Sequence, residues 1–221
     1  MTAIPKLLKL LDIHQTIVTI DGIGCQTDIV DTIVAQGADY VIAVKANQAT
    51  LFADVQAAFE PSLREFAPAY YKTVSKGHGR LEIRECWACQ AQDVLDFMGE
   101  YKAWTGLHCV VKIASERRLA GRVEQDVRYF ISSLTADPNR LLEVVRAHWQ
   151  IENQVHWVLD IAFRQDENRV RKDHAPHNLA ILQHLVLNLF KQDKSLKVGV
   201  NANRLRAGWD NAYLLNVLCS S

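Results

Sequence analysis

Four polar side chains recur at helical spacing between Arg146 and Asp160, in the segment RAHWQIENQVHWVLD. His148, Glu152, His156 and Asp160 follow one another at intervals of four residues. Residues four apart share one face of an α-helix, so a carboxylate and two imidazoles would line one ridge. Such a ridge can serve a metal, a proton or a phosphate, but a polar stripe on an amphipathic helix looks the same. The segment alone leaves both interpretations open.

A second carboxylate stands at the end of a predicted strand. Residues 16–22, TIVTIDG, are rich in β-branched residues and end at Asp21 and Gly22, which predicts a buried strand with Asp21 at its carboxyl end. Open α/β sheets place their sites at that end of their strands. Together with Glu152, Asp21 suggests a divalent-metal site for phosphodiesters, which normally has three acidic residues.

The elements around Asp21 predict a parallel sheet. Residues 3–12 and 25–36 have apolar residues at helical spacing, and Gly37 is a plausible stop for the second helix. Residues 40–45, YVIAVK, form a second apolar strand. Strand, helix and strand in this order make a βαβ unit, whose strands are parallel.

The pattern of predicted elements changes after residue 49. A short helix at 50–59 is followed by LEIRECWAC, HCVVKIASERR and DVRYFISSL, which read as antiparallel strands joined by short turns such as KGHGR. We interpret this part as an insertion in an α/β chain. The expected organisation is a first core part at 1–49, a strand-rich insertion at 50–138 and a helical C-terminal core part at 139–221. In the last part, residues 178–192 predict a strongly apolar core helix.

Composition restricts the class of protein. Of the 221 residues, 49% are hydrophobic and 23% charged, as in globular proteins. No apolar run approaches the roughly 18 residues of a membrane span, and the N-terminus is not a convincing signal peptide. We therefore expect a cytoplasmic protein with no membrane partner. Cys86 and Cys89 form a lone CxxC with no second pair, which we interpret as strand packing rather than a zinc site.

Charge is unevenly distributed although the net charge is zero. Residues 1–63 hold 3 Lys or Arg against 7 Asp or Glu, and residues 164–221 hold 9 against 5. An acidic first third suits a carboxylate metal centre, and a basic last quarter suits phosphate contact. Charged residues on solvent-exposed helix faces give a similarly uneven charge distribution, so neither interpretation is specific.

Seven short motifs run through nearly the whole chain. They are TAIPKLL at 2–8, VTIDGIGCQ at 18–26, GADYVIAVKANQ at 37–48, HGRLEIRE at 78–85, YFISSL at 129–134, HWQIENQVHWVLDIAF at 148–163 and NLAILQHLVLNLFK at 178–191. In this order they resemble the insertion-sequence transposases of the DDE class. The closest group is the H-repeat-associated family, a relative of the insertion-sequence-4 superfamily.

The resemblance implies an RNase H-like catalytic fold and a DNA transposition activity, cleavage followed by strand transfer. Asp21 matches the second catalytic Asp of the family and Glu152 its catalytic Glu, so both are the expected metal ligands. The cofactor implied is Mg²⁺ or Mn²⁺, with two ions in the complete enzyme. The partners implied are DNA, at insertion-sequence ends and target, and further copies of the chain in a homo-oligomer.

One departure from the family concerns the first catalytic Asp. The family carries it upstream of the motif matched by TAIPKLL, where Met1 stands here. None of Asp12, Asp28 and Asp31 is a natural replacement. We therefore expect an RNase H-like fold that lacks its first strands, and a truncated, inactive copy. The alternative is a non-catalytic remnant that binds DNA or inhibits a full-length transposase, so whether the chain is an enzyme stays open.

A second departure lies around Glu152. The wider superfamily has Tyr, Arg and Lys at the positions of Val145, His148 and Leu159. Arg146 is the candidate for the missing cation.

The expected DNA contacts are polar residues near the two acids or in basic stretches. A polar exit loop or a solvated charged loop is the competing interpretation. The candidates are Lys45, Asn47, Gln48, Arg80, Arg146, His148, Arg164, Arg169, Arg171 and Lys172.

Overall fold

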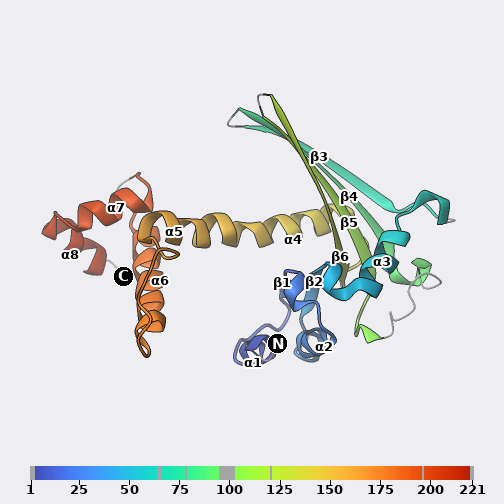
Figure 1. Cartoon of the computed structure of the whole chain (residues 1–221), viewed down its shortest axis with the longest axis horizontal. Coiled ribbons are helices and arrows are strands. Elements are labelled where there is room, and N and C mark those ends of the chain that lie inside the picture. The colour runs from blue at the N-terminus through green and yellow to red at the C-terminus, as the bar shows by residue number, and fades with distance from the viewer. Residues whose placement is uncertain are drawn as a thin grey trace. The chain divides into compact units, whose positions relative to one another are not determined.

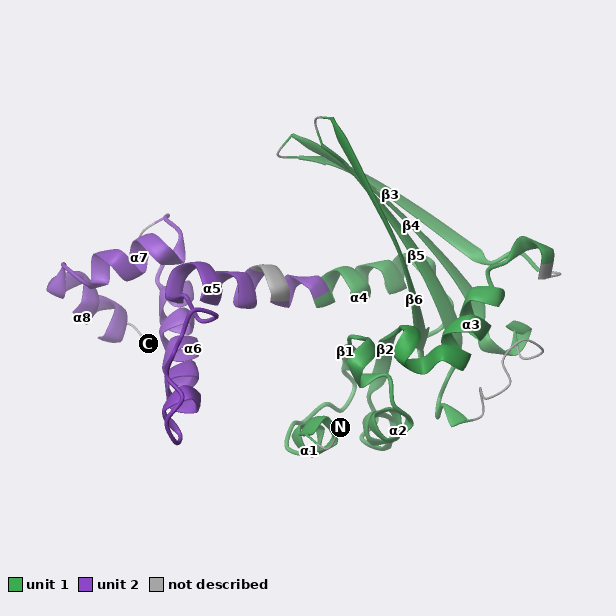
Figure 2. Cartoon of the chain, viewed as in Figure 1, with its two compact units in different colours: residues 1–148 green, residues 149–221 purple. Residues whose placement is uncertain are grey.

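The structure is a computed structural model that divides into two compact units, Met1–His148 and Trp149–Ser221 (Figure 2). The described residues are 3–63, 66–77, 79–94, 103–119, 121–195 and 197–219, without the side chains of Leu63, Glu152 and Asn153.

The first unit begins with the predicted βαβ unit (Figure 1). Helix α1 (Ala3–Leu8) is shorter than expected, and α2 (Thr27–Ala35) connects β1 (Ile17–Ile20) to β2 (Asp39–Val44). The two strands pair in parallel, which confirms the predicted sheet. Gly37 follows α2 with φ 72° and its N–H donates to the carbonyl of Val34, so the predicted stop is also confirmed.

Four long strands extend the same sheet. They are β3 (Ala69–Gly77), β4 (Arg80–Gln90), β5 (Cys109–Leu119) and β6 (Arg122–Ser132), and the sheet order is β1-β2-β6-β5-β4-β3. All pairs beyond β1–β2 are antiparallel, as predicted for the strand-rich section. Because β6 pairs with β2, the strand-rich section and the parallel pair β1–β2 belong to one continuous sheet. The outer ends of the four strands project as a long arm (Figure 1).

Both faces of β2 are buried. Tyr40 and Ile42 face a core built with α2, with α3 (Ala49–Ala57) and with the 3₁₀ turn η4 (Ala91–Val94). Val41 and Ala43 face the opposite core. This alternation on a strand buried on both sides explains its continuous apolar run.

Helix α4 (Pro138–Ile151) covers the second face through Leu141, Leu142, Val144 and Val145. Asp137 starts this helix, because its carboxylate accepts the N–H groups of Asn139 and Arg140 at 3.0 and 3.3 Å.

The CxxC pair lies within β4. Cys86 belongs to the core under α4, whereas Cys89 belongs to the opposite core, and both are buried. Residues three apart on a strand point to opposite faces of the sheet. The two sulfurs therefore cannot share one metal ion, and the prediction of strand packing is confirmed.

The second unit is helical. After α4 the chain passes through a π-helical segment, η6 (Glu152–His156), into α5 (Trp157–Phe163), and then into α6 (Ala175–Gln192), α7 (Val200–Ala207) and α8 (Asn211–Cys219). Phe190, Tyr213 and Val217 form one buried cluster of this unit, and Leu159, Ala162 and Leu187 are buried as well.

The prediction that residues 178–192 form a core helix is wrong for the outer side of α6. Ile181, Leu182 and Leu185 are about half exposed, at 47%, 57% and 54%. None of the described helices combines the length and apolar character that a membrane span requires.

Candidate active site

Asp21 and Lys45 meet where the two parallel strands end. Asp21 follows the last residue of β1, and Lys45 follows the last residue of β2. Since parallel neighbours have their carboxyl ends at one edge of the sheet, the two side chains are brought together. Lys45 Nζ lies 2.7 Å from Asp21 Oδ2, and the two side chains are 56% and 50% exposed. The sequence predicted this proximity but assigned Lys45 to DNA.

Two further donors from the same turn hold the backbone after Asp21. The 3₁₀ turn η1 (Gly22–Gly24) follows Asp21, and the 3₁₀ turn η2 (Ala46–Gln48) follows Lys45. Asn47 Nδ2 donates to the carbonyl of Gly22 at 2.8 Å, and Gln48 Nε2 donates to the carbonyl of Cys25 at 2.7 Å. The predicted DNA contacts Lys45, Asn47 and Gln48 therefore already have partners in the loop that carries Asp21.

The glycines of the motif permit this close packing. A Cβ on Gly22 would lie 2.7 Å from both Cγ and Cδ of Lys45, and one on Gly24 would lie 2.3 Å from Cγ2 of Ile20. Neither glycine needs a left-handed backbone here. The spacing Asp-Gly-x-Gly is required because the loop folds tightly against β1 and against the stem of Lys45.

Thr19 connects the strand of Asp21 to helix α4. Thr19 Oγ1 and His148 Nδ1 are 3.0 Å apart. Val18 and Ile20 pack against the core on the α2 side, so Thr19 points to the other face, which α4 covers. The sequence did not predict this contact. A lone Thr among β-branched apolar residues was the available signal.

The pKa of Asp21 is lowered from its ordinary value. Partial burial raises this pKa, but burial is outweighed by the hydrogen bond from Lys45, the backbone N–H of Gly22, and the electrostatic interactions with Lys45 and His148. Asp21 is therefore ionised at neutral pH.

Glu152 is the first residue of η6, and its side chain lies outside the described residues. The expected continuous α-helix through Glu152 is wrong here, because the backbone of residues 152–156 is π-helical and bonds i to i+5. Short π-helical segments inside α-helices occur frequently at functional sites.

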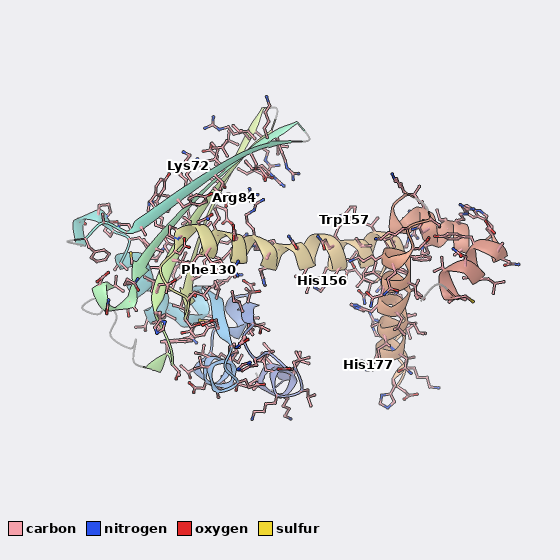
Figure 3. All side chains as sticks on the ribbon, turned by 180° about the vertical axis from the view of Figure 1, so that it is seen from behind. Lys72, Arg84, Phe130, His156, Trp157 and His177 are labelled. Atoms are coloured by element: carbon pink, nitrogen blue, oxygen red, sulfur yellow. The ribbon has the colours of Figure 1, made fainter. Side chains whose placement is uncertain are left out.

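Arg80 lies far from Asp21 along the sheet. The row of paired residues that contains Val44, the last residue of β2, includes Trp87 of β4. Arg80 is seven residues further along β4, roughly 23 Å at the usual rise per residue. There it forms a 2.8 Å ion pair with Glu82, on the arm that also carries Lys72 and Arg84 (Figure 3). The structure therefore does not bring Arg80 to the candidate site.

The remaining basic candidates are exposed. Arg146 lies on the solvent side of α4. In the second unit, Arg164 is 3.8 Å from Glu167 and Arg171 donates to the carbonyls of Asn168 and Val170. Neighbouring Arg169 and Lys172 are also exposed.

Asp21 thus stands at the carboxyl end of β1 as the first residue of an Asp-Gly-x-Gly turn. The family model described as "Transposase DDE domain" matches residues 1–189. The chain belongs to the DDE transposase family.

Curated relatives of this DDE transposase chain place it near the H-repeat-associated group, which confirms the resemblance. Over its full length it is 36% identical to the "H repeat-associated putative transposase YhhI" and to the "Putative protein YbfL", both of Escherichia coli K12. It is 32% identical to the "Putative transposase YncI" of Escherichia coli O157:H7. The chain spans 57–59% of the length of these relatives.

Among solved structures, the sugar N-methyltransferase KedS8 of Streptoalloteichus aligns with 56% of this chain and 43% of its own. The TM-score is 0.25 and the identity is 12%, values too low to indicate a common fold.

DDE transposases generally use divalent metal ions, but the described residues do not form a complete metal centre. They contain no group of three His, Cys, Asp or Glu side chains able to hold an ion. Asp21, the one described member of the expected set, has an ammonium group on its carboxylate.

Proposed function

We propose that residues 1–221 are part of a transposase catalytic region that acts on DNA by cleavage and strand transfer. The observation that carries this proposal is the position of Asp21, an ionised carboxylate at the carboxyl edge of a parallel strand pair. The family match over residues 1–189 supports it. The DNA substrates proposed are insertion-sequence ends and a target, with the protein working as a homo-oligomer.

Asp21 and Glu152 are the proposed ligands of Mg²⁺ or Mn²⁺, with two ions in the complete enzyme. Bound ions of this kind supply positive charge to the reacting phosphate and lower the pKa of a bound water or hydroxyl. In the described chain, Asp21 is held in position by the contacts of η1 and η2, and Thr19 connects its strand to α4.

These residues are proposed to be an RNase H-like core without its first strands, and therefore inactive by themselves. Strand β1 lies at one end of the sheet order and pairs only with β2 among the described strands. A further strand bearing a third acid would fit beside β1. The proposed organisation is a core at 1–49 and 139–221 with an insertion at 50–138.

DNA contact is proposed for exposed cations, which neutralise phosphates without reading sequence. Arg146, Arg164, Arg169, Arg171 and Lys172 meet this condition in the structure. Lys45, Asn47, Gln48, Arg80 and His148 would have to combine DNA contact with the intramolecular partners already described.

The test has two parts. Residues 1–221 are incubated with Mg²⁺ and labelled DNA carrying the ends of a related insertion sequence, and no cleavage is expected. Residues 1–221 then replace the matching part of a full-length relative such as YhhI, and the chimera is assayed for strand transfer. If residues 1–221 alone cleave the DNA and Asp21→Asn abolishes that cleavage, the proposal that their metal centre is incomplete is wrong. An inactive but folded chimera would contradict the transposase proposal.

A second candidate is inhibition of a full-length transposase. The open edge of β1 favours it, because unpaired backbone groups on an edge strand are a template for pairing with another chain. Residues 1–221 added to a strand-transfer reaction of a relative would reduce its rate under this candidate. An unchanged rate at a large excess of residues 1–221 would exclude it.

A further inference from the structure

We infer that Lys45 is a built-in counter-ion of Asp21, which orients the carboxylate and competes with external cations for it. The inference deepens the proposed function and rests on it in treating Asp21 as a metal ligand. The contact itself, 2.7 Å between Nζ and Oδ2, does not depend on that function.

Lys45 differs from the other two donors of its turn in what it binds. Asn47 and Gln48 donate to backbone carbonyls, so they hold the shape of the loop. Lys45 donates to the side chain of Asp21 and brings a positive charge to it. Removing Lys45 would therefore free a carboxylate while leaving two hydrogen bonds that maintain the loop.

The path of the Lys45 stem depends on Gly22. The methylene groups of Lys45 lie where a Cβ on residue 22 would stand, with separations of 2.7 Å from Cγ and Cδ and 3.0 Å from Cβ. A methyl group at position 22 would therefore push Lys45 away from Asp21. Two substitutions, Lys45→Met and Gly22→Ala, should therefore both remove the ammonium group from the carboxylate of Asp21.

An ordinary surface ion pair serves as the comparison. Lys72 Nζ lies 3.3 Å from Glu85 Oε1 on the arm, with side chains 45% and 31% exposed. Its exposure is similar to that of the Lys45–Asp21 pair, but it lies on adjacent strands away from the strand-end turns. Lys72→Met thus removes the same charge without touching the loop of Asp21.

Mn²⁺ binding to ¹⁵N-labelled residues 1–221 tests the inference. Paramagnetic broadening of the backbone amide signals of Gly22, Ile23 and Gly24 reports a cation held at Asp21. Lys45→Met should lower the Mn²⁺ concentration for half-maximal broadening about threefold to fivefold, in keeping with the strength of exposed ion pairs. Gly22→Ala should shift it in the same direction, since Lys45 is displaced while Asp21 is kept.

The matched variants separate this role from a purely structural one. Lys45→Arg keeps a cation and should behave like the unmodified chain, Lys72→Met should not change the response of the Gly22–Gly24 amides, and Asp21→Asn should remove that response. The inference is overturned if Lys45→Met binds no more tightly, if Lys45→Arg binds as tightly as Lys45→Met, or if no Asp21-dependent broadening occurs. Since strand transfer is not measured, failure of the transposase proposal would leave these results unaffected.

Discussion

The two units of the chain differ in how fully they bury their apolar side chains. In the first unit, α2 and α3 pack on one face of the sheet and α4 on the other, and residues such as Ile33 and Leu141 are 0% exposed. In the second unit Leu159 and Leu187 are buried and Phe190, Tyr213 and Val217 form a small cluster, but Leu182 and Leu185 remain more than half exposed. A unit of the first kind is stabilised by its own packing. A unit of the second kind exposes apolar surface that, in globular proteins, commonly marks an interaction site.

The two acids that the family resemblance singled out, Asp21 and Glu152, lie in different units. Asp21 is described in full: Lys45 binds its carboxylate, and the neighbouring residues Gly22 and Thr19 are held by Asn47 and His148. Glu152 begins the π-helical segment, which belongs to the second unit. The more fully packed unit thus carries the acid whose geometry is defined.

The largest expected effect tests whether both units supply an acid. In a chimera of residues 1–221 with a full-length relative, Asp21→Asn or Glu152→Gln should reduce strand transfer by about 10²- to 10³-fold or more if each acid is a metal ligand as proposed, because each variant then loses a ligand of the cations that act on the phosphate. The rate of strand transfer on labelled DNA gives the answer. If the Glu152→Gln chimera stays active, the second unit does not supply an acid that strand transfer requires.

Core substitutions compare the packing of the two units directly. Leu141→Ala in α4 should lower the free energy of unfolding by about 2–5 kcal/mol, because it leaves a cavity in a closed core. Leu185→Ala in α6 should change it by no more than about 0.5 kcal/mol, since its side chain is 54% exposed. Urea denaturation followed by circular dichroism measures both. Similar losses for the two variants would show that α6 is covered in solution.

A single hydrogen bond in the first unit should have a smaller effect. Thr19→Val keeps the volume and β-branching of the side chain but removes the partner of His148 Nδ1. The expected loss of stability is about 0.5–1.5 kcal/mol, measured by urea denaturation. Thr16→Val is a control that removes a local bond to the carbonyl of Ile13, and it should leave the ring signals of His148 in the NMR spectrum unchanged. If Thr19→Val also leaves those signals unchanged, the link to α4 is absent in solution.

The smallest expected effect is the pH dependence due to Asp21. Its pKa is lower in the folded chain than the ordinary value of 3.8. A carboxyl group of this kind contributes stability above its unfolded pKa and loses it as the pH falls through the folded pKa. Because Asp21 is half exposed, the contribution is only a few tenths of a kcal/mol.

The measurement is a difference between two chains. Urea denaturation of the unmodified chain and of Asp21→Asn from pH 6 down to about pH 2.5 should show curves that converge at the acid end. A constant difference across that range would mean that the Lys45 contact does not contribute to folding.

Much of the first unit was predictable because its signals are local. A β-branched run before Asp21, helical spacing before Gly37 and a second apolar run define the βαβ unit within about 30 residues, which is the usual size of that motif. The lone CxxC was also correctly interpreted, since residues three apart on a strand cannot share a metal. Local patterns of this kind depend on neighbours along the chain, which the sequence displays.

Other features depended on residues that are distant in sequence. Periodicity predicted a continuous α-helix through Glu152, and a π-helical segment occurs instead, because a shift of one residue in hydrogen bonding leaves no trace in apolar spacing. The apolar run of α6 predicted a core helix, although burial depends on what covers the helix. The expected roles of Lys45, Asn47 and Gln48 show the same limit, because an ammonium or an amide donates equally well to a phosphate, a carboxylate or a carbonyl.

By itself the sequence determined the family, the parallel strand pair and the position of Asp21 at its carboxyl end, since motifs and local propensity suffice for these. The tertiary structure decided that β6 returns beside β2, that Thr19 meets His148 and that the ammonium group of Lys45 binds the carboxylate of Asp21. These contacts join residues 24 to 129 positions apart. Strand order and packing select one partner for a side chain among many that are chemically equivalent. The spacing of residues along the chain predicts neither strand order nor packing.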